Sequence, residues 1–454
     1  MADLIGRKLN RLGQQLRGRL SMPGDGGYAA ATTIWAKPVG RKPRAVVHCR
    51  TIEDVQLAIR AARDCEVPLS VRGGGHDWAG RALCEGIVID LSGMNSVTVS
   101  ADKATATMSG GARAVDLVAV TDPLHVAPVT GSVGAVGMAG LTLGGGYGPL
   151  IGRFGLALDN LTAATVVLAD GRVVVATPTH EEELFWALRG GGGNFGVVVE
   201  MRHRLHDVPS IRSGMLIYPF AEAEAVLNGY TDIASSTPLE LTAQLGFAAG
   251  SDGAPVIMIV PTWCGLPEQG EASLEPFFKL GSVLASTVDV RPYGASLSLF
   301  DPYLAYGQRV FMESCCLPAL DSDSSGKFIE AMKSAVSPGC AIFTHDFKGE
   351  AAQVQTGATA FGLRRKHVLV ELLATFVDRS DALEEEQHQQ WLQTTLHGFD
   401  TIMLSSAYPN LLPKGDAARA ASSYGRNAER LLKAKRRYDP DNIFSSAIPL
   451  PVSR

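Results

Sequence analysis

The sequence lacks the patterns that mark many metal, nucleotide and membrane proteins. Its seven cysteines include no C-x-x-C pair, which favours a reducing compartment over a disulfide framework. It has no P-loop lysine motif, no G-x-S-x-G elbow and no H-E-x-x-H pair, and no group of His, Cys, Asp and Glu has metal-ligand spacing. No apolar run reaches the length of a bilayer. These absences predict a soluble, cytoplasmic protein that holds no metal.

Charge is sparse and nearly balanced. Charged residues make up 19% of the chain and the net charge is −5, which gives no support for a nucleic-acid or other polyanionic partner. The 454 residues suffice for two or three domains with large cores. The 49 glycines are clustered, and such clusters are typical of loops that lie against a cofactor.

Apolar runs and turn signals predict mixed helices and strands in the first half of the chain. Strands are predicted over residues 44–49, 69–72, 86–91, 104–109 and 197–205, a helix from a Thr51 cap to Cys65, and a hairpin at Asp170-Gly171. This order is typical of an α/β or α+β fold. Helices are also predicted over the basic N-terminal residues 1–20 and over residues 422–437.

After about Arg212 the pattern changes. Longer strands are predicted over residues 254–260, 309–317 and 367–376, and helices over residues 221–234, 326–335 and 381–396 lie between or after them. We therefore expect a second domain whose antiparallel sheet faces the first domain.

The run Gly73-Gly74-Gly75-His76 follows a predicted strand. Three glycines leave a backbone without Cβ atoms, so its N–H groups can lie directly against an anion or a flat cofactor. The neutral imidazole of His76 is then a nucleophile held at that surface. The run predicts a loop that binds a cofactor covalently, and its alternative is an ordinary glycine turn.

Two further glycine runs differ in meaning. Residues 191–196 read GGGNFG and match G-x-G-x-x-G, but a helix precedes them and a strand follows, which is the reverse of a dinucleotide fingerprint. We reject a nicotinamide site there. Residues 131–148 are rich in glycine and carry no charge, which suits a buried wall against an uncharged ring or a pyrophosphate. A glycine-rich packing loop is the alternative for this second run.

Taken together, these segments resemble the FAD-linked oxidases of the vanillyl-alcohol-oxidase superfamily. The resemblance is carried by SVRGGGH at residues 70–76, GIVIDL at 86–91, GLTLGGGYG at 140–148, FGLALDN at 154–160 and LFWALRGGGGNFGVV at 184–198. Residues 438–444, YDPDNIF, resemble the berberine-bridge-enzyme signature. Within that superfamily the chain is most similar to bacterial 6-hydroxy-D-nicotine-oxidase-like and natural-product tailoring oxidases of secondary metabolism.

The resemblance implies an α+β fold with a two-subdomain, PCMH-type FAD-binding domain. That domain is expected over residues 1–212 (core about 40–210), a substrate domain over 213–421, and a berberine-bridge-like segment over 422–454 that returns to the FAD domain. The resemblance also implies that His76 bonds to the flavin 8α-methyl carbon. The other implied FAD contacts are Arg72, Gly73, Gly74, Gly75, Asp77, Gly131, Val136, Gly137, Gly140, Gly144, Gly145, Asp159, Asn160, Gly196, Val197 and Asn442.

One departure from the family concerns a second covalent bond. Many relatives bond flavin through a cysteine in the glycine segment, where this chain has Val133, and no cysteine lies between Cys84 and Cys264. The resemblance therefore implies a single covalent link, through His76. Val136 matches a position that gates oxygen in the family, and valine there resembles oxidases; an ordinary core role is the alternative.

The catalytic base is less defined by the resemblance. Glu313 lies in the strand where relatives often hold a lysine or another polar group over the flavin, and Glu371 on strand 367–376 is a second candidate. A carboxylate beside an apolar cofactor face can accept a substrate O–H or N–H proton, although either residue can instead be a solvated strand residue. Tyr408 and Asn410 resemble a Tyr-x-Asn pair near the flavin. His125, His345 and His397 are assigned no chemical role.

The resulting hypothesis is an FAD-dependent oxidase of a small organic substrate. A C–H beside oxygen or nitrogen in an alcohol, an amine or a secondary-metabolite intermediate gives hydride to FAD, and O2 then reoxidises the cofactor to yield H2O2. The alternatives are a flavin dehydrogenase with another acceptor, or a catalytically degenerate flavin-binding protein. The sequence predicts neither the substrate nor the oligomeric state.

Overall fold

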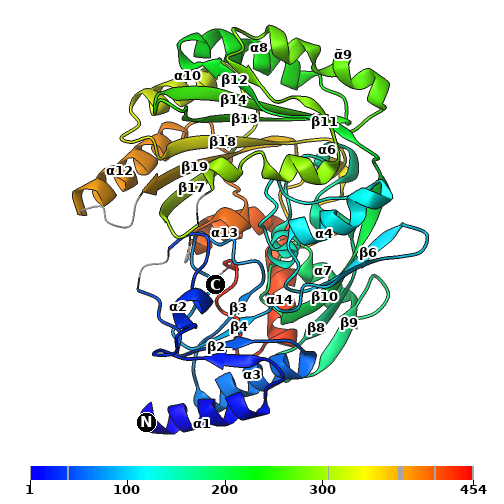
Figure 1. Ribbon diagram of the computed structural model, residues 1–454, viewed down its shortest axis with the longest axis vertical. Helices are drawn as coiled ribbons and strands as arrows, with labels where there is room; N and C mark the ends of the chain where they lie inside the picture. Colours follow the sequence, from blue (N-terminus) through cyan, green and yellow to red (C-terminus); the bar gives the residue numbers. More distant parts are fainter. Residues whose placement is uncertain (1, 38–39, 305, 377–381, 414–415, 452–454) are drawn as a thin grey trace.

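Three β-sheets form the framework of the molecule (Figure 1). The computed structural model describes residues 2–37, 40–304, 306–376, 382–413 and 416–451. Two smaller sheets lie in the lower half of Figure 1, and a nine-stranded sheet with its helices forms the upper half. This α+β arrangement confirms the predicted fold class. No helix within the described residues is long and apolar enough to cross a membrane.

The first sheet has four strands in the order β1-β2-β4-β3. Its strands are β1 (Arg19–Ser21), β2 (Ala45–His48), β3 (Leu69–Arg72) and β4 (Ile87–Asp90), and β2, β4 and β3 are parallel. The predicted helix α3 (Ile52–Cys65) is confirmed, and the Thr51 hydroxyl caps it by accepting a hydrogen bond of 3.3 Å from the Asp54 backbone N–H. Parallel strands need such a crossover connection. Helix α3 provides it between β2 and β3, so both strands end at the same edge of the sheet.

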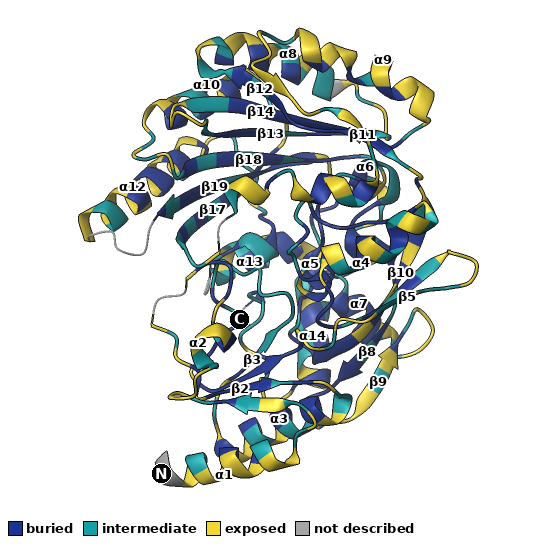
Figure 2. Cartoon of the chain, in the orientation of Figure 1, coloured by how far each residue is buried: buried dark blue, intermediate teal, exposed yellow. Residues whose placement is uncertain are grey.

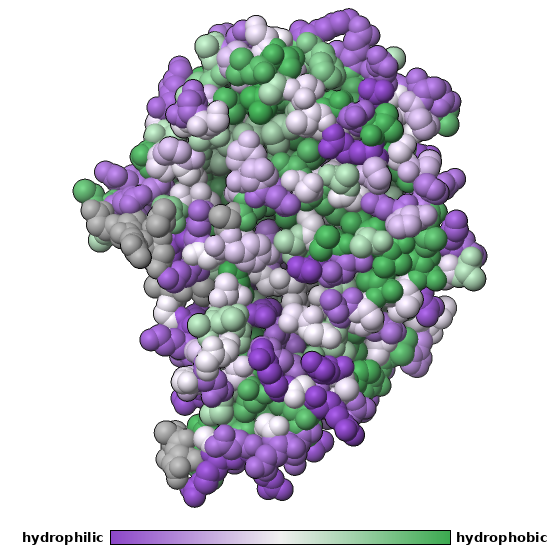
Figure 3. Space-filling view, in the orientation of Figure 1, coloured by the Kyte–Doolittle hydropathy of each residue, from purple (hydrophilic) through white to green (hydrophobic). Residues whose placement is uncertain are grey.

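The N-terminal helix α1 (Ala2–Gln15) is shorter than predicted. Leu9 and Leu12 are buried in the core beneath α3, while hydrophilic residues dominate its outer surface in Figure 3. Leu20, which we expected in the same helix, instead belongs to β1, because the chain turns back to pair with β2. Met1 lies outside the described residues.

The second sheet is antiparallel and has six strands. They are β5 (Val97–Val99), β6 (Thr105–Ser109), β7 (Val126–Pro128), β8 (Leu161–Val167), β9 (Val173–Ala176) and β10 (Val197–Asp207), accompanied by α4 (Ala114–Thr121), α5 (Met138–Gly144), α6 (Ile151–Phe154) and α7 (Glu182–Leu188). The short helix α2 (Tyr28–Ala31) belongs with the first sheet, where Ala31 packs with Val46 and Val88. The predicted hairpin between β8 and β9 is confirmed, with Gly171 at φ +86°. This left-handed conformation is one that glycine adopts readily.

The third sheet has nine strands and forms the roof of the site. Its elements are β11 (Ile211–Ser213), β12 (Leu216–Pro219), β13 (Leu241–Ala249), β14 (Pro255–Trp263), β15 (Ala285–Ser286), β16 (Asp289–Arg291), β17 (Arg309–Leu317), β18 (Cys340–Phe347) and β19 (His367–Phe376), with α8 (Ala223–Ser235), α9 (Gly270–Leu274), α10 (Ser322–Lys333), α11 (Glu350–Gln353) and α12 (Ala382–Gly398). Helices α8, α10 and α12 cover the outer face, and the inner face is turned toward the first two sheets (Figures 1 and 2). The predicted strands β17 and β19 are confirmed residue for residue, whereas β13 and β18 were missed. Of the helix predicted over 381–396, Asp381 lies outside the described residues.

The C-terminal segment contains two helices where one was predicted. Helices α13 (Ala417–Tyr424) and α14 (Ala428–Tyr438) are separated at Gly425, whose φ of +49° ends the first helix. Beyond α14 the chain returns to the first sheet, where Phe444 packs in the core with α1 and α3. Lys435 fixes this return by donating to the carbonyl of Phe444 at 3.1 Å and to Asp439 at 2.6 Å. The domain boundaries 1–212, 213–421 and 422–454 stay predictions.

Two buried histidines and a half-buried one make the fold sensitive to acid. Burial lowers the pKa of His203, His206 and His367 to about 4, whereas an unfolded histidine titrates near 6.5. Between pH 6.5 and 4 the unfolded chain therefore binds more protons, so stability is full above pH 6.5 and falls as pH drops toward 4. Each neutral histidine contributes a slope of about 1.4 kcal/mol per pH unit within that window.

We expect the melting temperature to fall steadily below pH 6.5, and thermal unfolding at pH 7.5, 6.5, 5.5 and 5 checks this. In the variant His203→Gln one of these titrating groups is removed, so the decrease between pH 6.5 and 5 should be shallower than in the parent protein. Equal slopes in the two proteins would show that His203 is not held neutral by the fold.

Candidate functional site

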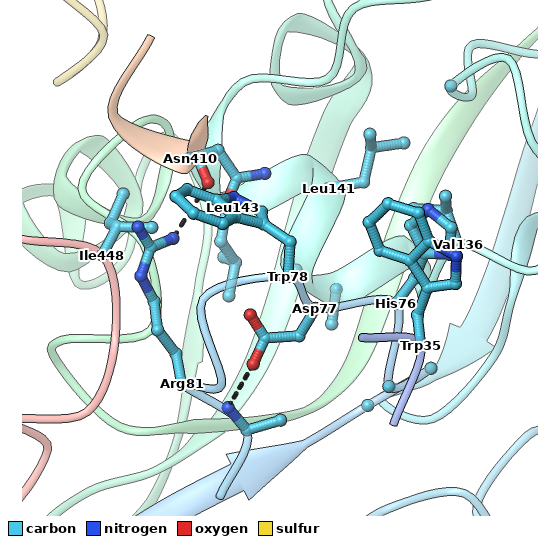
Figure 4. Close-up of a pocket in the computed structure, with 18 of the residues that line it drawn as sticks. Trp35, His76, Asp77, Trp78, Arg81, Val136, Leu141, Leu143, Asn410 and Ile448 are labelled. Carbon is cyan, nitrogen blue, oxygen red and sulfur yellow. Dashed lines mark hydrogen bonds between the residues drawn. The ribbon is translucent and has the colours of Figure 1, made fainter. Parts of the chain in front are cut away.

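A cavity of about 370 Å³ lies where the two lower sheets meet the inner face of the large sheet (Figure 4). Its walls come from the loop after β3, the segment around α5, the strands β17, β18 and β19, and the C-terminal return. Of the predicted cofactor contacts, it is lined by Gly73, Gly74, Gly75, His76, Asp77, Gly131, Val136, Gly137, Gly140, Gly196 and Val197. Segments far apart in the sequence thus meet at one site.

The first glycine run forms a wall through close backbone approach. A Cβ atom built on Gly74 would lie 2.5 Å from the backbone nitrogen of Gly137, and one on Gly137 would lie 2.4 Å from that of Gly74. Any larger residue at either position would push the two glycine segments apart. The two predicted glycine segments therefore pack backbone to backbone and form one wall of the cavity.

His76 follows this wall and stacks on Trp35, with ring centroids 4.6 Å apart. Its Nδ1 atom is buried and has no hydrogen-bond partner among the described residues. Burial lowers the pKa of His76 to about 4, so the ring is neutral at neutral pH. A neutral, unpartnered ring nitrogen is the form of histidine that acts as a nucleophile.

Several predicted contacts lie outside this cavity and support its walls instead. Arg72 lies at the base of the loop, where its guanidinium forms a 3.0 Å ion pair with the buried Asp90 on the neighbouring strand. Gly144 and Gly145 leave room for other residues: an added Cβ would lie 2.8 Å from Asn410 and 2.8 Å from Tyr408, respectively. These two glycines therefore allow the Tyr408 segment to reach the cavity.

The remaining three predicted contacts also lie outside the lining of this cavity. Asp159 forms an ion pair of 2.7 Å with the buried Arg364, and Asn160 donates to the carbonyls of Phe154 and Leu156. Both residues fix the loop that precedes β8. Asn442 is exposed, and its φ of +53° places it in the turn of the C-terminal return.

Glu371 and His345 form the polar part of the roof. The two residues are diagonal neighbours on β19 and β18, both line the cavity, and His345 Nε2 lies 3.1 Å from Glu371 Oε1. His345, which the sequence assigned no chemical role, therefore lies at the same cavity as Glu371. Strand β18 was not predicted, so nothing in the sequence indicated that this histidine faces Glu371.

Glu313 does not reach the cavity. On β17 the neighbouring Met312 lines it, and Glu313 points to the opposite face, where Arg419 donates to its carboxylate at 3.0 Å. Successive side chains of a strand point to opposite faces, which explains why only one of this pair enters the site. Of the two predicted carboxylates, the structure brings only Glu371 to the cavity.

Tyr408 and Asn410 line the cavity beside Tyr147, as the Tyr-x-Asn pattern predicted. The backbone N–H of Gly146 donates to Tyr408 Oη at 3.0 Å. Tyr147 Oη donates at 2.7 Å to Nε2 of His367, whose Nδ1–H donates to the Arg365 carbonyl at 2.7 Å. This chain of hydrogen bonds fixes the Tyr147 ring at the cavity wall.

Aromatic and cationic residues of the site were missed from the sequence. They include Trp35, Trp78, Arg81, Phe300, Tyr303 and Phe343. Trp78 and Arg81 follow His76 by two and five residues, so their position after the glycine loop was an available signal. Phe300 and Phe343 come from the large domain, where no local motif marks them.

Comparisons with known proteins agree with this geometry. A family described as FAD binding domain matches residues 43–177, and one described as berberine and berberine like matches residues 407–451. The chain is 29% identical over 424 residues to the FAD-linked oxidoreductase aurO of Gibberella zeae, covering 92% of this chain and 82% of that protein. It is 31% identical over 288 residues to (R)-6-hydroxynicotine oxidase of Paenarthrobacter nicotinovorans, covering 63% of each chain.

Solved structures share the whole architecture. The crystal structure of 6-hydroxy-D-nicotine oxidase from Arthrobacter nicotinovorans superimposes with a TM-score of 0.84 at 26% identity, covering 95% of this chain and 97% of that chain. Glucooligosaccharide oxidase from Acremonium strictum has a TM-score of 0.84 at 25% identity and covers 99% of both chains.

The cavity fits the FAD that these similarities indicate. Its glycine wall lets a flat cofactor lie directly against backbone, because no side chain intervenes at Gly74 and Gly137. Buried polar atoms of His76, Trp78 and Arg81 have no protein partner among the described residues, and buried polar groups in native proteins are normally satisfied. A bound cofactor with polar edges would supply those partners.

Proposed function

Because the chain belongs to the FAD-linked oxidoreductases of the berberine-bridge-like family, we propose that it is an oxidase of a small organic substrate. FAD held against the glycine wall would supply a hydride acceptor for a C–H beside oxygen or nitrogen, and its reoxidation by O2 would give H2O2. The similarity to a 6-hydroxynicotine oxidase supports this reaction class. The observation that carries the proposal is that Glu371, an acid–base group, lines the same cavity as His76 and the glycine wall.

Glu371 is the proposed proton acceptor. As the substrate C–H bond breaks, an adjacent O–H or N–H must also lose its proton, and a carboxylate in the cavity can take it. His345 Nε2 lies 3.1 Å from Glu371 Oε1, so a proton on that nitrogen would hold Oε1 and leave the other carboxylate oxygen to face the substrate. Tyr408 and Asn410 lie on the same cavity and would orient the substrate polar group.

His76 is the proposed covalent anchor of FAD, and we infer a single link. Its neutral, unpartnered Nδ1 atom suits nucleophilic attachment. No cysteine occurs among the described residues that line the cavity, and Val133 and Val136 occupy the wall of the second glycine segment. One anchor keeps the cofactor in place without the further change in electronic properties that a second bond would bring.

The proposal is tested by mixing the anaerobic holoenzyme with candidate alcohols, amines and phenols and recording the flavin absorbance. Bleaching by a compound, followed by recovery and stoichiometric H2O2 on admission of air, is expected. Bleaching without peroxide would instead indicate a dehydrogenase with another acceptor. No bleaching by any compound would indicate a flavin-binding protein without this chemistry.

The apolar walls of the substrate side favour a flat, hydrophobic substrate. Trp78, Phe300, Leu304, Met312, Phe343 and Leu373 line the cavity, and its polar side chains include Gln244, His345, Glu371, Tyr408 and Asn410. A sugar would leave several hydroxyls without partners against such walls, each costing about 1–3 kcal/mol. We therefore expect kcat/KM for aromatic alcohols or amines to exceed that for oligosaccharides by at least ~100-fold.

Steady-state peroxide assays on the two substrate classes check this expectation. Phe343→Ala should lower kcat/KM for the aromatic class while FAD content is unchanged, because Phe343 belongs to the roof and not to the glycine wall. Comparable efficiency on an oligosaccharide would contradict the assignment.

A further inference from the structure

Arg81 lines the cavity at the end opposite His76 (Figure 4). Figure 4 shows Arg81 and Ile448 on one side of the group of lining residues and His76 with Trp35 on the other. The guanidinium donates to the carbonyl of Asn410 at 2.9 Å and to the carbonyl of Leu412. Its Nε–H is buried and has no partner among the described residues.

The charge of Arg81 is balanced by the protein only through space, by the nearby Asp77. Within the described residues no carboxylate forms an ion pair with it. The nearby Asp77 accepts from the backbone N–H groups of Ala79 at 3.0 Å and Ala82 at 2.7 Å. Arg41 adds a second guanidinium to the same loop by donating to the carbonyls of Gly80 and Leu83.

Such an arrangement is costly without a ligand. Guanidinium stays protonated in proteins, and the half-buried Arg81 keeps a buried Nε–H to which no protein atom among the described residues gives a partner, so part of the cation loses hydration that is not replaced. An anionic or electron-rich group bound in the cavity would offset this cost. Two parts of FAD have that chemistry: the pyrophosphate, and the pyrimidine half of the ring, which gains negative charge when it takes up electrons.

We propose that Arg81 faces the pyrimidine half of bound FAD and raises the potential at which the cofactor accepts electrons. This rests on the proposed anchoring at His76, since a ring attached there by its benzenoid edge extends its pyrimidine edge toward the other end of the cavity. A fixed positive charge at that edge stabilises the reduced form more than the oxidised form. Arg81 is thus a cofactor-tuning residue that touches no substrate.

The test compares the midpoint potentials of purified holoenzymes by equilibration with a reference dye. In Arg81→Met the equilibrium between reduced and oxidised FAD should shift at least tenfold toward the oxidised form, which is about 30 mV for a two-electron couple. Arg81→Lys keeps the charge and should stay within threefold of the parent protein. Arg41→Met removes a guanidinium that contacts the same loop from the segment before β2 and does not line the cavity, and should leave the potential unchanged.

Three results would overturn the proposal. If Arg81→Met keeps its FAD content and its potential is unchanged, the charge does not act on the ring. If the variant binds less FAD and the FAD that remains has an unchanged potential, Arg81 is assigned to the pyrophosphate. Equal shifts in the Met and Lys variants show that the hydrogen bonds to Asn410 and Leu412 matter and the charge does not.

Sulfite affinity of the oxidised holoenzyme gives a second readout, because the sulfite adduct places negative charge in the same half of the ring. Arg81→Met should weaken it at least tenfold, and unchanged affinity would also contradict the proposal. Neither measurement uses a substrate, so both can be made even if the protein oxidises none of the compounds tested. Failure of the oxidase function is seen separately, as the absence of bleaching.

Discussion

Replacing Glu371 with glutamine is expected to slow reduction of bound FAD by substrate roughly 100- to 10,000-fold, which is the usual contribution of a positioned acid or base. The amide has nearly the shape of the carboxylate but cannot accept a proton. Hydride departure would then leave a protonated, positively charged product unless water took the proton instead. Stopped-flow absorbance under anaerobic conditions measures this step directly, without interference from the reaction with O2.

Glu313→Gln provides the matched control for this prediction. Both carboxylates lie on adjacent strands, and both contact a basic side chain, but Glu313 pairs with Arg419 on the opposite face of the sheet. We expect its reduction rate to stay within about threefold of the parent protein, since its carboxylate is separated from the proton-transfer step. A large loss in Glu313→Gln together with a small one in Glu371→Gln would reverse the assignment made from the geometry.

The contrast between Glu313 and Glu371 shows what a sequence pattern does and does not determine. Both strands were predicted with their observed ends. The ends do not determine which alternate residues of each strand face the cavity, and this decides the side of the sheet that each carboxylate occupies. A shift of one residue moves a side chain to the other face. Met312 and Glu371 face inward because β17 and β19 pair in a register that no local motif encodes.

The cofactor wall was predictable because its determinants are local. A strand followed by Gly73-Gly74-Gly75-His76 places bare backbone and an imidazole next to each other, and this does not depend on contacts with distant parts of the chain. The partner wall at Gly137 was predictable by resemblance, although only the fold shows that a Cβ on Gly74 would lie 2.5 Å from the Gly137 nitrogen. His345 illustrates the other extreme, since its role depends wholly on pairing between β18 and β19.

Replacing His76 with alanine is expected to abolish covalent attachment of FAD. Alanine has no nucleophilic nitrogen, and the described cavity lining offers no cysteine that could bond to the cofactor instead. In the parent protein the intact denatured chain should carry the added mass of the dinucleotide, and acid precipitation should leave the yellow colour in the pellet. In His76→Ala the chain mass should be unmodified and the colour should remain in the supernatant.

His397→Ala controls for the loss of a histidine as such, because His397 is exposed on α12, far in sequence from the glycine loop. It should retain the full added mass. His76→Ala should also turn over more slowly, since an electron-withdrawing attachment strengthens the flavin as a hydride acceptor and the lost anchor lets it dissociate. Retained covalent flavin in His76→Ala would refute the anchor. It would also remove the orientation on which the assignment of Arg81 depends, because that orientation requires one ring edge to be fixed beside Trp35.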